Sequence, residues 1–198
     1  RFVQAGFSRL QALSGQGARP FDKDRDGLSL GEGAGYILLK RETAPFLRVS
    51  GWGAACDAGH ITAPCRRASG LIKAISQTTG DGGRKVGAIN AHGTGIVYND
   101  AMEMVAIDQI FNGGIPVHSV KGSIGHTLGA AGVIEAALAF KALREGVIPP
   151  TADLAVPEKE GWLVSGEKKH ILGHPSILTC NSGFGGVNAA LLLEHDTG

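Results

Sequence analysis

The spacing of apolar residues along the chain predicts helices that alternate with short strands. Apolar residues at helical spacing predict helices over residues 1–14, 69–79, 99–111 and 128–145. Short apolar runs predict strands over residues 36–39, 46–54, 86–91 and 115–120. Two last runs, 177–179 and 189–193, bracket a glycine-rich turn and predict a hairpin. Strands that alternate with helices favour an α/β lobe, and no interior linker divides it.

The ends of these elements carry further signals. The helix over 128–145 is the strongest prediction because it is rich in alanine and is followed by Gly146. Residues 56–67 form a polar loop, and residues 151–176 are rich in loop signals. The first helical pattern begins at Arg1 without an initiator methionine, so we expect a chain cut from a longer one.

Composition excludes some classes of partner. The 198 residues include 19 Lys and Arg against 18 Asp and Glu, a net charge of +1. This balance gives no reason to expect nucleic acid or an anionic membrane as a partner. The 31 glycines cluster in short motifs beside hydrophobic segments, which indicates tight turns and backbone packed close to a ligand.

The three cysteines, Cys56, Cys65 and Cys180, are too few and too scattered for a disulfide framework or a zinc site. We expect reduced thiols in a cytoplasmic protein. No apolar run reaches the length of a transmembrane span, and no signal peptide is recognisable. Nothing in the sequence indicates a cofactor.

Two motifs resemble ligand sites but fail on their context. Residues 22–27, Asp-Lys-Asp-Arg-Asp-Gly, open like a calcium loop, yet Gly33 occupies the position that requires a glutamate. We expect a salt-bridged turn and no metal. Residues 31–35, Gly-Glu-Gly-Ala-Gly, precede a predicted strand and not a helix, so they are not a dinucleotide fingerprint. Backbone crowding near a sheet edge is the expected role.

Two histidines stand where ligands bind in α/β proteins. His92 follows a predicted strand, and His126 lies between a strand and the strongest helix, each beside glycines. Strand carboxyl ends and helix N-termini are common ligand sites, although a single histidine is more often structural. Lys121 lies shortly before His126, and a nearby cation would favour a neutral imidazole. The other five histidines lack this context.

Four motifs in this order resemble those of the β-ketoacyl synthase family. They cover residues 19–35 (Arg-Pro-Phe-Asp, Arg-Asp-Gly and Gly-Glu-Gly-Ala-Gly), 90–94 with Asp100 and Glu103, 121–132 with Glu135, and 181–188. The resemblance spans residues 1 to about 194. It implies a five-layered αβαβα thiolase-like fold, of which residues 1–198 supply mainly the C-terminal repeat.

The resemblance also implies a decarboxylative Claisen condensation in fatty acid or polyketide-type biosynthesis. In this reaction an acyl group is held on a cysteine, and a malonyl thioester loses carbon dioxide and attacks it. His92 and His126 then correspond to paired donors that stabilise the enolate, with Lys121 supporting them. Thr94, Gly183 and Phe184 correspond to substrate-binding positions. Four further positions match residues that surround a structural cation in some members: Asn90, Glu135, Asn181 and Ser182.

The sequence departs from the family pattern at two places. None of the three cysteines lies in a strand-to-helix elbow, so the resemblance places the nucleophilic cysteine in an N-terminal lobe that this chain lacks. The last loop usually carries a gating phenylalanine before its Gly-Phe-Gly-Gly, and here Gly183 follows Ser182 directly. This departure puts gating and control of chain length in doubt.

The family implies several partners. They are acyl carrier protein, acyl and malonyl thioesters, the N-terminal half of the same enzyme, and a second subunit in a homo- or heterodimer. An alternative is a non-catalytic, ketosynthase-like subunit of the chain-length-factor type. Retention of both His92 and His126 argues against this alternative, because a silent partner has no chemical need for them.

Overall fold

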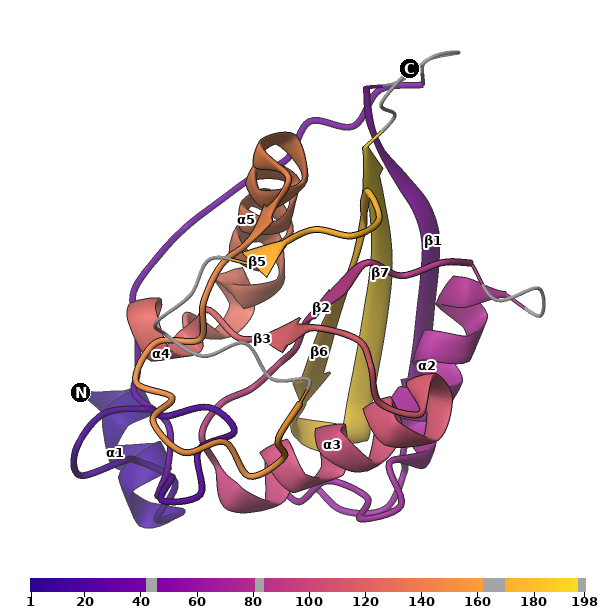
Figure 1. Ribbon diagram of the computed structural model, residues 1–198. Helices are drawn as coiled ribbons and strands as arrows, with labels where there is room; N and C mark the ends of the chain where they lie inside the picture. The colour runs from indigo at the N-terminus through magenta and orange to yellow at the C-terminus, as the bar shows by residue number, and fades with distance from the viewer. Residues whose placement is uncertain (42–45, 81–83, 162–169, 196–198) are drawn as a thin grey trace.

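A five-stranded mixed sheet organises the chain (Figure 1). The computed structural model describes residues 1–41, 46–80, 84–161 and 170–195. The strand order is β1 (Leu47–Cys56), β7 (Val187–His195), β6 (Ser176–Gly183), β2 (Ala88–Asn90) and β3 (Val117–His118). Strand β7 is antiparallel to both of its neighbours, whereas β2 is parallel to β6 and β3. The predicted α/β class is confirmed.

The β6–β7 hairpin brings the glycine-rich loop over residues 183–186 to the carboxyl end of β2. Its register runs from Ser176 opposite Glu194 to Gly183 opposite Val187, and a 3-10 turn, η2 (Phe184–Gly186), closes it. The predicted hairpin is confirmed, but its strands are longer than expected. Asn181 therefore lies in paired strand and not in the turn, because antiparallel pairing continues to Gly183.

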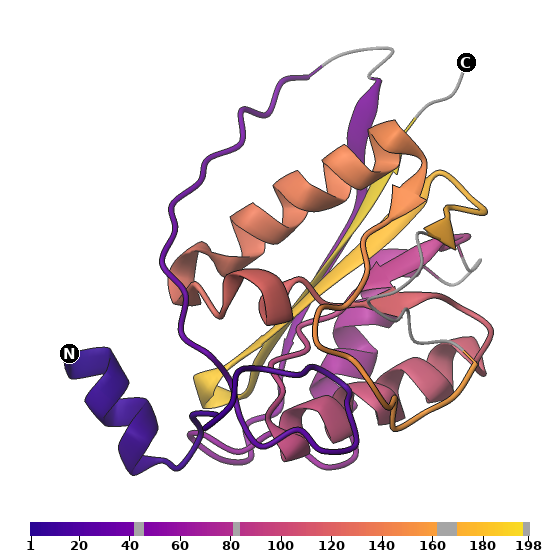
Figure 2. The ribbon, with the colours of Figure 1, turned by 60° about the vertical axis from the view of Figure 1, so that its left-hand side comes forward.

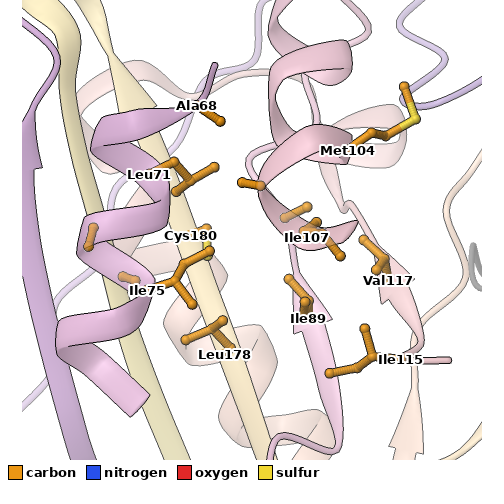
Figure 3. Close-up of a cluster of buried hydrophobic side chains, with 14 of the residues drawn as sticks. Ala68, Leu71, Ile75, Ile89, Met104, Ile107, Ile115, Val117, Leu178 and Cys180 are labelled. Carbon is orange, nitrogen blue, oxygen red and sulfur yellow. The ribbon is translucent and has the colours of Figure 1, made fainter. Parts of the chain in front are cut away.

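Two helices, α2 (Ser69–Thr79) and α3 (Val97–Phe111), cover one face of the sheet. Their apolar side chains form a buried cluster with the sheet (Figure 3). Helix α2 lies close to β1 because the strand has glycines there: a Cβ on Gly51 would lie 2.2 Å from the carbonyl oxygen of Thr78. The predicted bounds of α2 are confirmed, and α3 begins two residues before its predicted start.

Helix α5 (Ala131–Glu145) covers the opposite face. Its alanines pack on the strands in a second buried cluster. It ends at Gly146, which has a left-handed φ of 65°, as the sequence predicts. The predicted first turn is instead a 3-10 turn, η1 (Leu128–Ala130), preceded by the short helix α4 (Lys121–Ile124). The described residues thus form three layers, helix, sheet and helix.

The strand predicted over 36–39 is wrong. This segment runs extended along the outer side of α5, away from the sheet (Figure 2). Gly33 and Gly35 pack against side chains of α5, but Tyr36 is 96% and Leu38 80% exposed. The run has the apolar character of a strand, yet no described segment lies beside it to provide hydrogen bonds.

Other predicted elements are shorter than expected. Helix α1 (Phe2–Arg9) replaces the predicted 1–14 because Gln11 has a φ of 53°, which interrupts the helix. The strands predicted over 86–91 and 115–120 contract to β2 and β3. A small sheet that the sequence did not predict pairs β4 (Val147–Ile148) with β5 (His170–Ile171). The predicted loop-rich stretch includes residues 162–169, which lie outside the described residues.

In the part of the chain that the structure describes, no helix combines the length and apolar character needed to cross a membrane.

Candidate active site

His92 lies two residues after β2, in a loop that two buried carboxylates hold. Glu103 of α3 accepts hydrogen bonds from the backbone N–H groups of His92 (2.7 Å) and Gly93 (2.6 Å). Asp100, one turn earlier, accepts from Thr94 and Gly95. The loop therefore owes its shape to helix α3, which supplies an acceptor for each successive amide.

These two carboxylates are deeply buried and close to each other. Burial, then the neighbouring Asp100 charge, raises the pKa of Glu103 to about 8, against the backbone donors at Gly93 and His92 and the charge of Lys121. Burial also raises the pKa of Asp100 to about 6, opposed by backbone donors and by Arg25. The loop that carries His92 thus rests on groups whose charge responds to pH.

Lys121, the first residue of α4, connects His92 to helix α5. Its side chain is 1% exposed and its Nζ donates to Glu135 Oε1 and to the carbonyl oxygen of His92. The third donor of this ammonium lies 3.3 Å from His92 Nδ1. Asn181 Oδ1, which can only accept, lies at the same 3.3 Å from Nδ1. The full positive charge of the Lys121 ammonium favours an unprotonated Nδ1 over this neutral amide contact, which places the imidazole proton on Nε2.

His126 follows α4 and is held by backbone contacts to a distant segment. Its N–H donates to Ser29 O at 2.7 Å, and its carbonyl accepts from Gly31 N at 3.1 Å. Its Nδ1 accepts from Leu128 N at 3.3 Å, so its imidazole proton also belongs on Nε2. Leu128 supplies this amide from a left-handed backbone conformation with a φ of 55°.

The two imidazoles lie edge to face. Their ring centroids are 5.2 Å apart and the rings are inclined at 85°. Burial, then the charge of Lys121, lowers the pKa of His126 to about 4. The same causes, with the neighbouring His126, hold the pKa of His92 well below its usual value. Both rings are therefore neutral near pH 7, and each has one N–H to donate.

A pocket of about 470 Å³ opens onto both histidines. Its lining includes all three predicted substrate-binding residues, Thr94, Gly183 and Phe184. The ring of Phe184 stacks on Phe7 of α1, with centroids 5.7 Å apart. No cysteine of the described residues lines the pocket, and Cys180 is buried within β6. The pocket can hold a thioester, but it brings no thiol to it.

A second pocket of about 270 Å³ adjoins the first. The two share part of the loop 62–64 together with Ile96, Asn99 and Phe184. Its own lining adds Arg66 and Tyr98, both exposed. The two pockets are therefore neighbours, and the histidines line only the first.

The residues matched to a structural cation do not fit one in this chain. Glu135 has both oxygens engaged, one by Lys121 and one by Asn181 Nδ2 at 2.8 Å. Ser182 donates to Asn188, so its hydroxyl is also used. Lys121 already supplies the positive charge at this position. Asn90 Oδ1 is buried without a hydrogen-bond partner among the described residues, but a single free oxygen does not make a cation site.

The loop of residues 19–27 uses its carboxylates for structure. Asp22 accepts from the backbone N–H groups of Ala155 and Val156, each at 2.8 Å. Asp26 accepts from Ser14 and lies 3.8 Å from Arg19, in agreement with the salt-bridged turn that we expected. Of the glycines over 31–35, only Gly31 crowds backbone, that of the loop before His126, whereas Gly33 and Gly35 lie against side chains of α5 and its approach. The expected place at a sheet edge is therefore wrong.

Sequence reasoning missed two residues of this site and gave a third a different role. Phe7 lines the pocket, but the sequence marks it only as an apolar position in a helix. Asn181 contacts His92 Nδ1 at 3.3 Å and Glu135, where the resemblance had suggested only a cation ligand. Ser119 is fully buried between the two histidine loops, and its place two residues before Lys121 was the one available signal.

Comparison with known families gives two matches. A model described as "Beta-ketoacyl synthase, C-terminal domain" matches residues 47–155. A model described as "Beta-ketoacyl synthase, N-terminal domain" matches residues 1–44. The second match contains α1 and part of the extended segment that runs outside α5.

Curated relatives carry consistent names. The chain is 38% identical to "3-oxoacyl-[acyl-carrier-protein] synthase 2" of Synechocystis sp., covering 96% of this chain and 50% of that protein. It is 35% identical to the protein of the same name in Rhizobium meliloti, covering 100% and 52%. The chain thus spans about half the length of the curated relatives that it matches.

Solved structures show the same fold. "The ishigamide ketosynthase/chain length factor" superposes with a TM-score of 0.86 at 31% identity, over 99% of this chain and 51% of that one. A ketosynthase in complex with its chain length factor from Xenorhabdus doucetiae gives a TM-score of 0.82 at 31% identity, over 96% and 49%.

Proposed function

This chain belongs to the β-ketoacyl synthase family, and from that premise we propose that it carries the enolate-stabilising site of a condensing enzyme. The whole protein would be an acyltransferase of fatty acid or polyketide-type biosynthesis. The observation that carries the proposal is the pair of neutral imidazoles of the buried His92 and the half-buried His126, each with Nε2–H available at one pocket.

The chemistry follows from this donor pair. In a malonyl thioester, the bond between C2 and the carboxylate carbon breaks, carbon dioxide leaves, and the electron pair becomes an enolate on the thioester oxygen. Two N–H donors from His92 and His126 stabilise that charge as it forms. The enolate carbon then attacks the acyl-enzyme carbonyl; the new C–C bond forms, the C–S bond breaks, and cysteine thiolate leaves.

Lys121 serves this chemistry by keeping His92 in the required tautomer. Its ammonium donates to Nδ1 of His92 and disfavours a second proton on the ring. Glu135 pairs with Lys121 and offsets its buried positive charge. The substrate therefore does not face an uncompensated cation. Lys121 is thus a positioning group, and the two histidines are the groups that touch substrate.

We assign the connected pockets to a carrier-borne thioester. The inner pocket, with Thr94, Gly183 and Phe184, would hold the thioester and acyl chain. The outer pocket would hold the arm that delivers it, with Arg66 at its rim available to an acidic carrier protein. This supports acyl carrier protein as a partner; the structure of one fold relative describes a ketosynthase with its acyl carrier protein.

The nucleophilic cysteine would come from the N-terminal half of the same enzyme. Exposed apolar side chains on the extended segment beside α5, including Tyr36, Leu38 and Leu39, suit a covered interface there. A second sheet that accepts this segment would complete the five expected layers. It would also bring a thiol to the pocket, which no cysteine of the described residues lines.

The test is malonyl decarboxylation by the complete enzyme. We expect His126→Ala and His92→Ala each to lower the rate of carbon dioxide release by about 100- to 1,000-fold, the usual loss for one oxyanion donor. Self-acylation, followed by intact mass, should persist. His170→Ala, in β5 and outside the pocket lining, is the matched control. Undiminished decarboxylation in either site variant would refute the assignment.

A second candidate is a non-catalytic partner subunit, favoured by relatives solved as ketosynthase and chain length factor pairs. The intact masses of all polypeptides in the purified protein decide between them. A chain that carries a cysteine elbow and also contains this sequence supports the condensing enzyme. This sequence in a chain without such an elbow, paired with a second chain that has one, supports the non-catalytic subunit in a heterodimer.

A further inference from the structure

Ser119 occupies the junction between the two histidine loops. It follows β3 and precedes α4, and its side chain is fully buried. Its hydroxyl donates to the carbonyl oxygen of Gly93 at 2.7 Å and accepts from the N–H of Lys121 at 3.2 Å. One side chain therefore bonds the residue after His92 and the first residue of the helix that leads to His126.

Ser119 is itself held from a third direction. Its backbone N–H donates to Oγ1 of Thr151 at 3.1 Å, and Thr151 is also fully buried. The strand pairing adds a neighbouring bond, from Ala91 N to His118 O at 2.8 Å. Ser119 consequently has little freedom to move without breaking other hydrogen bonds.

The contact with Gly93 leaves no spare room. A Cβ built on Gly93 would lie 2.6 Å from Cβ of Ser119. The N–H of Gly93 is bound by Glu103 and its carbonyl by Ser119, so the peptides beside His92 are fixed from both sides. Through Lys121, the same hydroxyl fixes the start of α4, whose last residue lies two positions before His126.

We propose that Ser119, braced by Thr151, is a positioning residue that sets the separation and relative angle of the two imidazole donors. The proposal rests on the proposed function, because two donors aimed at one enolate oxygen must keep a fixed distance. A misplacement of about 1 Å can cost roughly 100-fold in rate. Ser119 does not touch the substrate; it acts through the backbone of both loops.

The protein contains a matched control for the loss of such a hydroxyl. Ser176 in β6 is also fully buried; its hydroxyl donates to Lys85 O at 2.8 Å and accepts from Gly87 N at 3.1 Å. Its Oγ also lies 3.0 Å from Nδ1 of His174. Ser176→Ala removes bonds of the same kind as Ser119→Ala, but outside the pocket lining.

The experiment compares these variants in the complete enzyme. We expect Ser119→Ala to lower kcat for malonyl decarboxylation by roughly 10- to 100-fold with KM changed less than about twofold, because orientation and not binding is lost. Ser119→Cys, with a weaker donor, should restore part of kcat, and Thr151→Val should reproduce part of the loss. Ser176→Ala should stay within about twofold of wild type. Equal kcat for Ser119→Ala and Ser176→Ala would overturn the proposal.

A second readout separates this proposal from the proposed function. Imidazole ¹⁵N and ¹H NMR signals of His92 and His126 should shift in Ser119→Ala and stay in place in Ser176→Ala. If the wild-type enzyme does not decarboxylate a malonyl thioester, the proposed function fails. The NMR signals of His92 and His126 then still test whether Ser119 positions the two imidazoles. Unchanged signals in Ser119→Ala would then refute it.

Discussion

The ion pair between Lys121 and Glu135 shows how much one buried charge can depend on another. Both side chains are 1% exposed. Removing one member of such a pair leaves an uncompensated buried charge, whereas replacing both with apolar groups is often neutral. Lys121 thus has a structural role in addition to the one that we propose for it beside His92.

We predict that Lys121→Met destabilises the complete enzyme by about 3–5 kcal/mol, measured by denaturant unfolding, because it leaves Glu135 unpaired. The double variant Lys121→Met/Glu135→Leu should recover most of that loss. As a control, Lys141→Met breaks an exposed pair with Glu145 and should cost less than about 1 kcal/mol. A double variant no more stable than the single one would contradict the prediction.

His118 of β3 is a buried histidine outside the proposed mechanism. It is 1% exposed, and neither ring nitrogen has a hydrogen-bond partner among the described residues. Burial lowers its pKa to about 4. Since the unfolded chain takes up this proton near pH 6.5, the unfolded state binds more protons below that pH. The contribution of His118 to the free energy of unfolding is therefore fully present above about pH 6.5 and is lost as the pH falls toward 4.

We predict that His118→Leu removes part of this acid sensitivity. The gap between the two pKa values corresponds to about 3 kcal/mol once His118 is fully protonated. Thermal midpoints at pH 7.5 and pH 5 test the prediction, and the difference between them should shrink in the variant. His92 and His126, whose pKa values are also depressed, contribute with the same sign, whereas Asp100 and Glu103, whose pKa values are raised, contribute with the opposite sign. The test is therefore the change that the variant makes to the difference and not the size of the difference itself. An unchanged difference would exclude His118 as a source.

At the scale of elements, the contact between the segment after Leu28 and the His126 loop positions the second imidazole. Leu30 and His126 form an isolated parallel bridge, and Gly31 lies against the end of α4. A Cβ on Gly31 would be 2.1 Å from the carbonyl oxygen of Ile124. Because that neighbour is backbone, relief requires the loop itself to move.

We predict that Gly31→Ala lowers malonyl decarboxylation at least tenfold, by displacing His126, and destabilises the protein by roughly 1–3 kcal/mol. Gly173→Ala is the control, because a Cβ there meets nothing within 4 Å and the backbone needs no left-handed φ. Steady-state kinetics and thermal unfolding provide the measurements. Wild-type kinetics in Gly31→Ala would show that the loop tolerates the shift.

The turn that resembles a calcium loop gives another prediction at this scale. Asp22 accepts three backbone hydrogen bonds, from Asp24, Ala155 and Val156. These bonds use the oxygens that a cation would need. We predict that excess chelator leaves the thermal midpoint unchanged, whereas Asp22→Ala lowers it. A fall of several degrees on adding chelator would reveal a metal.

At the scale of the whole molecule, the outer side of α5 is the face that other polypeptide should cover. The apolar side chains of the segment 36–39 are exposed there, and the segment is extended without a strand partner among the described residues. Large exposed apolar patches mark interaction surfaces. The segment has the backbone shape that a sheet edge could accept.

We predict that the amides of residues 36–40 are protected from hydrogen exchange in the complete enzyme, because they form strand hydrogen bonds with the other half. The exposed loop residues 58–61 should exchange rapidly in the same experiment and are the internal reference. Rapid exchange over residues 36–40 would mean that this segment does not join a second sheet.

Local patterns were sufficient for much of the fold. The amphipathic spacing of 69–79 gave α2 with both bounds, and Gly146 ended α5 as predicted. The glycine-flanked histidines were found because strand ends and helix starts leave local signals. Segment 36–39 was predicted wrongly because an apolar run reports the need for burial, not which partner provides it.

The sequence alone therefore determined the class of fold, the family resemblance and the candidate residues His92, His126 and Lys121. Tertiary structure decided the 5.2 Å approach of the imidazoles, the pairing of Lys121 with Glu135, and the contact of Phe7 with Phe184. Periodicity and turn signals depend on neighbours along the chain, whereas these contacts join residues far apart in sequence. These contacts form only when the sheet and α5 have packed together, because packing brings the side chains within reach and burial then shifts their pKa values.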